Sequence, residues 1–161
     1  MTSHIPDGYS AVTPWVIGPD TAGLIDFLKA AFGAHELSRI TAPDGRIAHA
    51  EVRVYDAVVM AFDRPKGWPA TPAFIRLYVD DCDATFARAI KAGGTMVSGC
   101  KRLAFGDSVG RVRDPFGNIW WLQTHQEDVS QDEMERRSLD PVYADAMKYM
   151  EDTLVTGLKP E

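Results

Sequence analysis

The chain repeats its own pattern once, and this repeat constrains the fold more than any other feature. Two segments, about 9–62 and 73–125, each contain the signals of a strand, a helix and three further strands. Gly33, which follows the first helical pattern, is matched about 60 residues later by Gly93 or Gly94. The sequence therefore predicts an α+β fold made of two tandem βαβββ modules.

Helix caps and turns divide each module into its elements. Asp20 or Thr21 precedes the first apolar pattern of helical period, as an N-cap does. Asp81 or Asp83 has the same place before the second pattern. A proline-rich linker at 64–71, with Pro72 just beyond it, separates the modules. The expected strands are 9–17, 35–41, 46–55 and 58–62 in the first module, and 73–79, 95–103, 108–113 and 118–124 in the second.

A tight turn joins the last two expected strands. It has the sequence Asp114-Pro115-Phe116-Gly117, with proline at the second position to fix φ and glycine near the end to tolerate a positive φ. The strand that follows carries the adjacent residues Trp120 and Trp121. Because neighbouring strand residues face opposite ways, one indole must pack in a core and the other must lie on the opposite face of the sheet.

The last part of the chain, 126–161, has a different pattern. Ser130 opens a capping box, and Asp140 with Pro141 supplies a second cap and a proline for the first helical turn. We expect a helical extension whose apolar face covers a sheet or a partner subunit, with a lid over a site as the functional alternative. The residues on that face are Tyr143, Met147, Met150 and Leu154.

Composition narrows the class of protein. The chain has 161 residues, 45% hydrophobic and 25% charged, and a formal net charge of -6, so a nucleic-acid partner is not expected. No apolar run is long enough to span a membrane, and the start of the chain lacks the pattern of a signal peptide. Cys82 and Cys100 show no metal-binding spacing, and we interpret them as reduced thiols of a cytoplasmic protein.

These motifs together resemble the glyoxalase/bleomycin-resistance/dioxygenase superfamily, also called vicinal oxygen chelate proteins. The repeat, the 114–117 turn, and Gly106 to Arg111 with its Gly-Asp-x-x-Gly-Arg pattern are most similar to the PhnB-like branch. The resemblance implies one domain at 1–125 and an extension at 126–161. It also implies that each module curls into half of a cup with its helix outside, and that a small-molecule ligand and a homodimer are to be expected.

The resemblance also assigns four positions that often hold a divalent metal ion in this superfamily. In this chain they are occupied by Thr13, Met60, Phe74 and Trp121. These side chains do not form a site for a hard cation, so we expect no metal and no other cofactor.

Strand alternation predicts which other residues line the cup. The result is an aromatic cavity with a few charges, which is typical of small-molecule sites. His49 and Glu51 are the candidate catalytic residues, as a possible acid–base pair on one strand. The expected ligand-binding residues are Trp15, Arg53, Met60, Phe62, Phe74, Arg76, Tyr78, Trp121 and Gln123.

Two functions from different classes fit this pattern. The first is a metal-free binding protein that sequesters an aromatic or heteroaromatic ligand, such as an antibiotic or secondary metabolite, and so gives resistance to it. The second is a metal-independent isomerase, lyase or cyclase with His49 or Glu51 as base. A third reading, a metal-dependent glyoxalase or dioxygenase, would need metal ligands at unexpected positions. The sequence therefore leaves open whether the protein is an enzyme.

Overall fold

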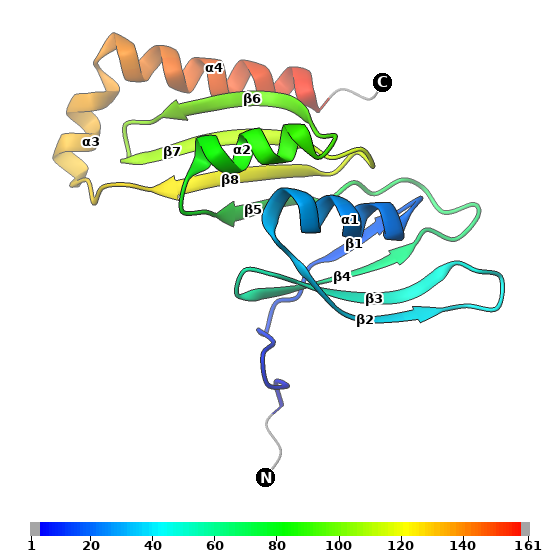
Figure 1. Ribbon diagram of the computed structural model, residues 1–161. Helices are drawn as coiled ribbons and strands as arrows, with labels where there is room; N and C mark the ends of the chain where they lie inside the picture. The colour runs from blue at the N-terminus through cyan, green and yellow to red at the C-terminus, as the bar shows by residue number, and fades with distance from the viewer. Residues whose placement is uncertain (1–3, 159–161) are drawn as a thin grey trace.

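The computed structural model describes residues 4–158 and contains two sheets of four strands each (Figure 1). The outermost residues of the two expected segments, 1–3 and 159–161, lie outside the described part. Both sheets have the same strand order, with a parallel pair at one side, so the structure confirms the tandem repeat. The first sheet has the order β1 (Trp15–Gly18), β4 (Ala57–Asp63), β3 (Ile47–Val54) and β2 (His35–Thr41). The second has the order β5 (Phe74–Tyr78), β8 (Ile119–His125), β7 (Asp107–Arg113) and β6 (Thr95–Arg102).

Each sheet carries one helix on its inner face, α1 (Thr21–Phe32) and α2 (Cys82–Lys91), and the two helices pack against each other (Figure 1). The Asp20 side chain caps α1 by accepting from the Gly23 N–H at 2.9 Å. Asp81 caps α2 in the same way. Gly33 ends α1 in the left-handed conformation, with φ 67°, which few residues other than glycine adopt at low cost.

The core lies between the helices and the two sheets, and Trp120 is at its centre. This indole is fully buried, and its ring lies 5.3 Å from the ring of Phe32 on α1. Trp121 faces the other side of the same sheet, as the alternation of strand residues predicts. The tight turn forms as expected, with Gly117 at φ 97° and the Asp114 N–H bonded to the Asn118 carbonyl.

The first strand begins at Trp15, so the prediction of a strand from residue 9 is wrong. Pro14 lacks the N–H that a strand donates to its neighbour, and the chain before it takes another course. There the hydroxyl of Tyr9 donates to Glu51 Oε2 at 2.5 Å, and the Gly8 carbonyl accepts from Arg53 Nη1 at 3.2 Å. The N-terminal segment therefore contacts the face of the first sheet that α1 does not cover.

The tail forms two helices, α3 (Gln131–Ser138) and α4 (Pro141–Gly157), capped by Ser130 and Asp140. Helix α4 runs along β6 (Figure 1), and Met150 at its centre is almost fully buried. The Tyr149 hydroxyl accepts from the Gly99 N–H at 2.8 Å. Helix α4 thus covers part of the second sheet, which confirms the structural reading of its apolar face.

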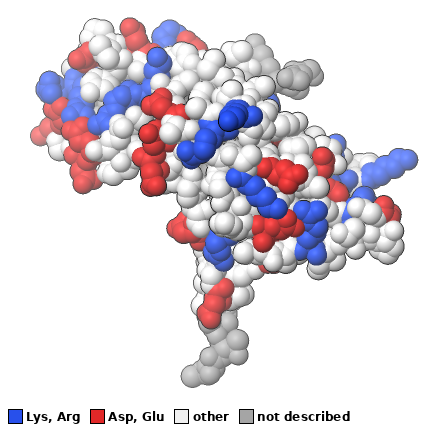
Figure 2. Space-filling model, in the orientation of Figure 1, with Lys and Arg blue, Asp and Glu red and all other residues white. Residues whose placement is uncertain are grey.

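Charged residues of both signs are intermixed on the face drawn in Figure 2, including the part over α3. Among the charged residues near α3, Glu127 pairs with Arg102 and Arg137, and Glu133 pairs with Arg136 and Arg137. The two arginines hold the pKa of Glu133 at about 2, well below its usual range. None of the helices between residues 4 and 158 combines the length and the apolar character needed to cross a membrane.

Candidate functional site

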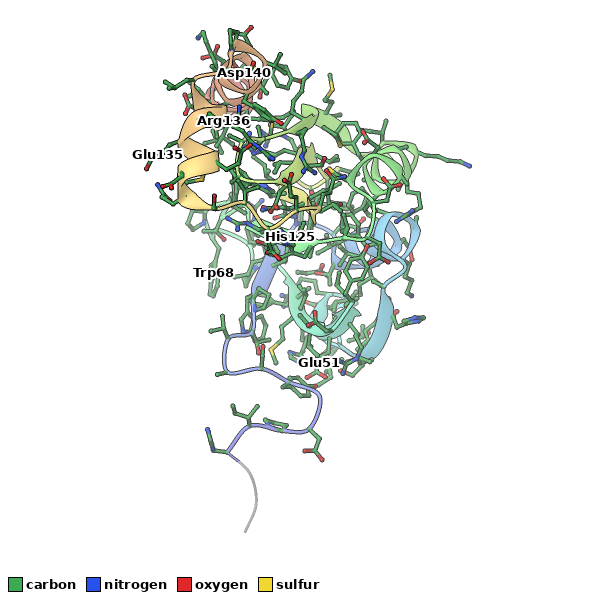
Figure 3. The ribbon with its side chains drawn as sticks, turned by 90° about the vertical axis from the view of Figure 1, so that its left-hand side faces the viewer. Glu51, Trp68, His125, Glu135, Arg136 and Asp140 are labelled. Atoms are coloured by element: carbon green, nitrogen blue, oxygen red, sulfur yellow. The ribbon has the colours of Figure 1, made fainter. Side chains whose placement is uncertain are left out.

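The residues expected to line one cup lie on two different sheets of the chain. Figure 3 shows Glu51 on the first module, His125 higher up at the end of β8 in the second, and Trp68 in the linker. The structure thus presents two half-sites, each on the face of a sheet that α1 or α2 does not cover. Trp15, His49, Glu51, Arg53, Met60 and Phe62 belong to the first sheet. Phe74, Arg76, Tyr78, Trp121 and Gln123 belong to the second.

The first half-site is an open aromatic surface. The ring of Trp15 lies edge-on at 5.6 Å from His49 and at 5.4 Å from Phe62. Trp68 lies edge-on to Phe62 on the linker side, at 6.2 Å. Trp15 is 47% exposed and Trp68 55% exposed. These rings can contact a flat molecule or another protein surface, but they do not enclose one.

The candidate catalytic pair is present in the first half-site. His49 Nε2 lies 3.1 Å from Glu51 Oε1, and Tyr9 donates to the other oxygen. The hydrogen bonds from Tyr9 and from His49 lower the pKa of Glu51. Lowering that pKa makes the carboxylate a weaker base, so this arrangement favours a fixed polar contact over proton abstraction by Glu51. Arg53 Nη1 donates to the Gly8 carbonyl and so holds the N-terminal segment.

The second half-site is a cavity of about 600 Å³ between the second sheet and α4. This volume suits a drug-sized ligand, and the wall is mostly apolar with a few polar groups. Residues of α4, for which the sequence analysis offered both a covering role and a lid over a site, supply one wall. The lining residues are Arg76, Tyr78, Leu103, Phe105, Asp107, Arg111, Trp121, Gln123, Met147, Met150, Glu151 and Leu154.

Arg111 is the main cavity residue that the sequence analysis did not include among the expected ligand-binding residues. Its side chain is 4% exposed, and Nη1 donates to the Met150 carbonyl at 2.6 Å and to Ser98 Oγ at 3.1 Å. The guanidinium carbon lies 4.0 Å from the centre of the Trp121 ring, a cation–π contact. Burial lowers the pKa of Arg111. The signal that could have identified it is its strand position, directly beside Trp121.

Asp107 is the buried carboxylate at the other side of the cavity. Its Oδ2 accepts a hydrogen bond from Gln123 Nε2, and its Oδ1 lies 2.8 Å from His125 Nδ1. His125 Nε2 lies 3.1 Å from Asp128. His125 is thus held by two carboxylates. Both oxygens of the Asp107 carboxylate therefore already have a hydrogen-bond partner.

His125 gives the protein a predictable pH dependence. Its pKa is raised above its ordinary value of 6.5, first by the hydrogen bond to Asp107 and then by that to Asp128. A raised pKa means that the protonated form stabilises the fold below about pH 6.5, and that this contribution is lost as pH rises through the folded-state value. We expect His125→Gln to lower the melting temperature more at about pH 5.5 than at about pH 8.5. An equal loss at both pH values would contradict this assignment.

The four metal positions implied by the resemblance do not gather hard ligands. Thr13 Oγ1 donates to the Ser10 carbonyl, and Met60, Phe74 and Trp121 offer no hard oxygen or imidazole donor. Between residues 4 and 158, no group of three or more His, Cys, Asp or Glu side chains is arranged to hold a metal ion. The residues present therefore do not fit the superfamily's metal.

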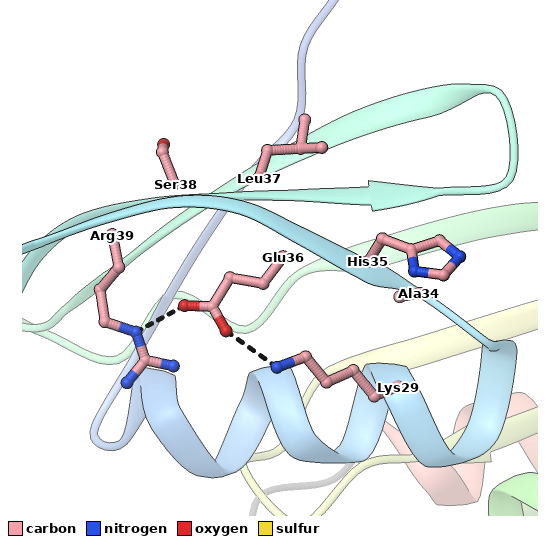
Figure 4. Close-up of a pocket in the computed structure, with 7 residues that line it drawn as sticks. All are labelled: Lys29, Ala34, His35, Glu36, Leu37, Ser38 and Arg39. Atoms are coloured by element: carbon pink, nitrogen blue, oxygen red, sulfur yellow. Dashed lines mark hydrogen bonds and ion pairs between the residues drawn. The ribbon is translucent and has the colours of Figure 1, made fainter.

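A second hollow of similar size lies at the outer edge of the first module, between α1 and β2 (Figure 4). Its carboxylate, Glu36, is already paired with Lys29 at 2.8 Å and with Arg39 at 2.7 Å. Its described lining includes His35 but no Phe, Tyr or Trp side chain. We therefore regard it as a surface groove and not as a ligand site.

The two cysteines lie together on the helix side of the second sheet. Cys82 at the start of α2 and Cys100 on β6 are free thiols, with their sulfur atoms 3.0 Å apart. The hydrogen bond with Cys82 and burial raise the pKa of Cys100. Because Cys82 is buried on the face opposite the cavity, the pair takes no part in either half-site.

Comparisons with known proteins agree with the tandem-module fold. Residues 11–122 match the model of the Glyoxalase/Bleomycin resistance protein/Dioxygenase superfamily, so α3 and α4 lie beyond the matched region. An uncharacterized protein of Mycobacterium tuberculosis is 38% identical over 136 residues, which cover 78% of this chain and 80% of that protein.

Solved structures show the same fold. TioX from Micromonospora sp. ML1 has a TM-score of 0.61 and 26% identity, and the match covers 72% of this chain and 98% of TioX. A Bacillus cereus structure titled as a PhnB protein and putative 3-demethylubiquinone-9 3-methyltransferase has a TM-score of 0.55, covering 71% of this chain and 99% of that one. At 16% identity this second likeness shows the fold alone.

Proposed function

We propose that this chain, which belongs to the Glyoxalase/Bleomycin resistance protein/Dioxygenase superfamily, binds an aromatic or heteroaromatic small molecule between its second sheet and α4. Binding would sequester the molecule, such as an antibiotic or secondary metabolite, without a metal ion and without changing it. The PhnB-like branch does not by itself indicate a ligand, because one fold serves many functions.

The single observation that carries the proposal is the aromatic and thioether lining of the cavity. Trp121 and Tyr78 line the cavity from the sheet, and Met147 and Met150 line it from α4. Stacking on an aromatic ring contributes about 1 kcal/mol beyond area burial, and methionine adapts to irregular ligand shapes. These side chains can hold a flat ligand through non-covalent contacts alone, without any reaction of the ligand.

A second copy of the chain is part of the proposal. Cup-facing aromatic side chains remain exposed on both sheets, with Trp15 at 47%, Phe74 at 46% and Tyr78 at 59%. Exposed aromatic groups of this size are typical of surfaces that meet a partner. A homodimer could bring the first half-site of one copy toward the second half-site of the other and so unite the residues predicted to form one cup.

The alternative is a metal-independent isomerase, lyase or cyclase. The observation in its favour is the chain of hydrogen bonds from Tyr9 to Glu51 and His49, beside the exposed Trp15 ring. His49 would then act as base, and Arg53 or Arg76 would stabilise an anionic intermediate. We favour binding because Glu51 already has partners and its lowered pKa makes it a weak base. The third reading, a metal-dependent enzyme, lacks suitable donors at the four expected positions.

Native mass spectrometry and ligand recovery separate these functions. The protein as purified is compared with the same sample unfolded, and any bound organic molecule is then incubated with excess protein. We expect a dimer, and a ligand recovered unchanged with both the unaltered chain and His49→Ala. Turnover that disappears in His49→Ala would establish the enzyme and overturn the binding proposal. A stoichiometric divalent metal in the native sample would move the protein to the metal-dependent reading.

A further inference from the structure

Arg111 has an unusual environment for a buried cation. It is 4% exposed, and among residues 4–158 it forms no ion pair with a carboxylate. Its two acceptors, the Met150 carbonyl and Ser98 Oγ, are neutral, and its Nε–H has no acceptor. Burying a charge without a counter-ion costs free energy, so the position of Arg111 needs a physical reason.

Trp121 connects this cation to a second one. The guanidinium carbon of Arg76 lies 5.2 Å from the centre of the Trp121 ring, and that of Arg111 lies 4.0 Å from it. Arg76 is exposed and likewise forms no ion pair among the described residues. The indole Nε1–H of Trp121 is buried without an acceptor. Two guanidinium groups therefore lie beside one aromatic ring, and neither has a carboxylate partner in the described part of the chain.

The carboxylates that line the cavity do not balance these arginines. Asp107 is engaged by Gln123 and His125. Glu151 projects from α4, is exposed and forms no ion pair with Arg76 or Arg111 in the described part of the chain. The two arginines beside Trp121 thus keep their charge without an ion-pair partner among the described residues, although Asp107 and Glu151 also line the cavity.

We propose that the ligand of this cavity is an anion, an aromatic carboxylate or a molecule with equivalent charge, whose ring stacks near Trp121 and whose negative group faces Arg76 and Arg111. This inference rests on the proposed binding function and specifies its ligand class. Arginine suits the task because its planar guanidinium can hold a carboxylate through two hydrogen bonds and can stack on an aromatic ring at the same time. Arg76, being exposed, would make the first contact. The buried Arg111 would add a longer-range attraction that water screens only weakly.

Two probes of equal ring size test the charge. Binding of naphthoate and of its neutral amide, naphthamide, is measured by isothermal titration calorimetry on the full chain at low and at physiological salt. We expect naphthoate to bind at least about tenfold more tightly, since a hydrogen bond to a charged group is about twice as strong as a neutral one. Arg76→Gln should weaken naphthoate binding by about tenfold and leave naphthamide binding unchanged.

The control is Arg46→Gln, which removes an exposed arginine from the turn before β3, away from the cavity. It should leave the affinities of both probes unchanged. Equal affinities for naphthoate and naphthamide, with binding still lost in Trp121→Ala, would overturn the anion inference and retain the binding function. If a naphthyl ammonium probe bound more tightly than naphthoate, the ligand would be a cation and the anion inference would be wrong. Failure of all probes to bind at about 1 mM, with no ligand in the purified protein, would overturn the binding function itself.

Discussion

Asp114→Ala is expected to lower the free energy of unfolding by about 3–5 kcal/mol, the largest stability loss we predict for an exchange outside the apolar core. The Asp114 carboxylate is buried and accepts four hydrogen bonds, at 2.8 to 2.9 Å. The donors are the N–H groups of Phe116 and Asn118, the Asn118 amide and the Trp120 indole. Removing the carboxylate leaves buried donors without an acceptor. Guanidinium-induced unfolding, followed by tryptophan fluorescence, measures the loss.

The matched control is Asp44→Ala, which removes an aspartate from another tight turn. Asp44 is exposed and bonds only to its neighbour Arg46, so the loss should stay below about 1 kcal/mol. If the two variants lose similar stability, the Asp114 carboxylate does not organise the hairpin. Because Trp120 Nε1 bonds to this carboxylate, Asp114→Ala should also loosen the packing of Trp120 on Phe32.

Trp121→Ala is expected to weaken ligand binding by about 30- to 100-fold, the largest functional effect of a single exchange. Removing the indole takes away the ring on which the ligand stacks. It also removes the cation–π partner of the Arg111 guanidinium, which lies 4.0 Å from the ring centre. Calorimetric titration with naphthoate measures the effect. Trp121→Phe keeps a ring in place and should retain most of the affinity, which separates loss of stacking from loss of fold.

Trp68→Ala is the matched control, since it removes an indole from the exposed linker of the other module. We expect naphthoate affinity within about twofold of the unaltered chain, because the linker does not line the cavity. If Trp68→Ala weakens binding as strongly as Trp121→Ala, the ligand contacts the first half-site, either in the same chain or in a second copy.

The sequence was sufficient for the architecture because the relevant signals are local. The helix caps, the left-handed glycine at 33 and the 114–117 turn each depend on a few neighbouring residues, and all are confirmed. The opposite directions of Trp120 and Trp121 follow from strand geometry alone. The first strand was predicted too long because the apolar residues before Pro14 do not reveal that Tyr9 bonds to Glu51, a contact 42 residues away.

The candidate site was only partly predictable because it depends on contacts between distant segments. The apolar face of the tail helix predicts that the helix packs against an apolar surface, but it does not say which surface of the protein or of a partner that is. Arg111 reaches Met150, 39 residues further along the chain, and a pattern centred on the Gly106 loop contains no sign of this. Strand alternation did place Arg76, Tyr78, Trp121 and Gln123 correctly on one face. Strand alternation does not show how the two sheets are arranged, so it could not predict that the two half-sites of one chain lie apart on separate sheets.

The central claim is that an aromatic ligand binds beside Trp121, between the second sheet and α4. The chain has four tryptophans, whose indole N–H signals can be assigned by single substitution in proton–nitrogen correlation spectra. Titration with naphthoate should shift the Trp121 signal, because that N–H has no acceptor, and leave the Trp120 signal in place, because its N–H is bonded to Asp114. Shifts confined to Trp15 and Trp68 would place the ligand on the first sheet and contradict the account.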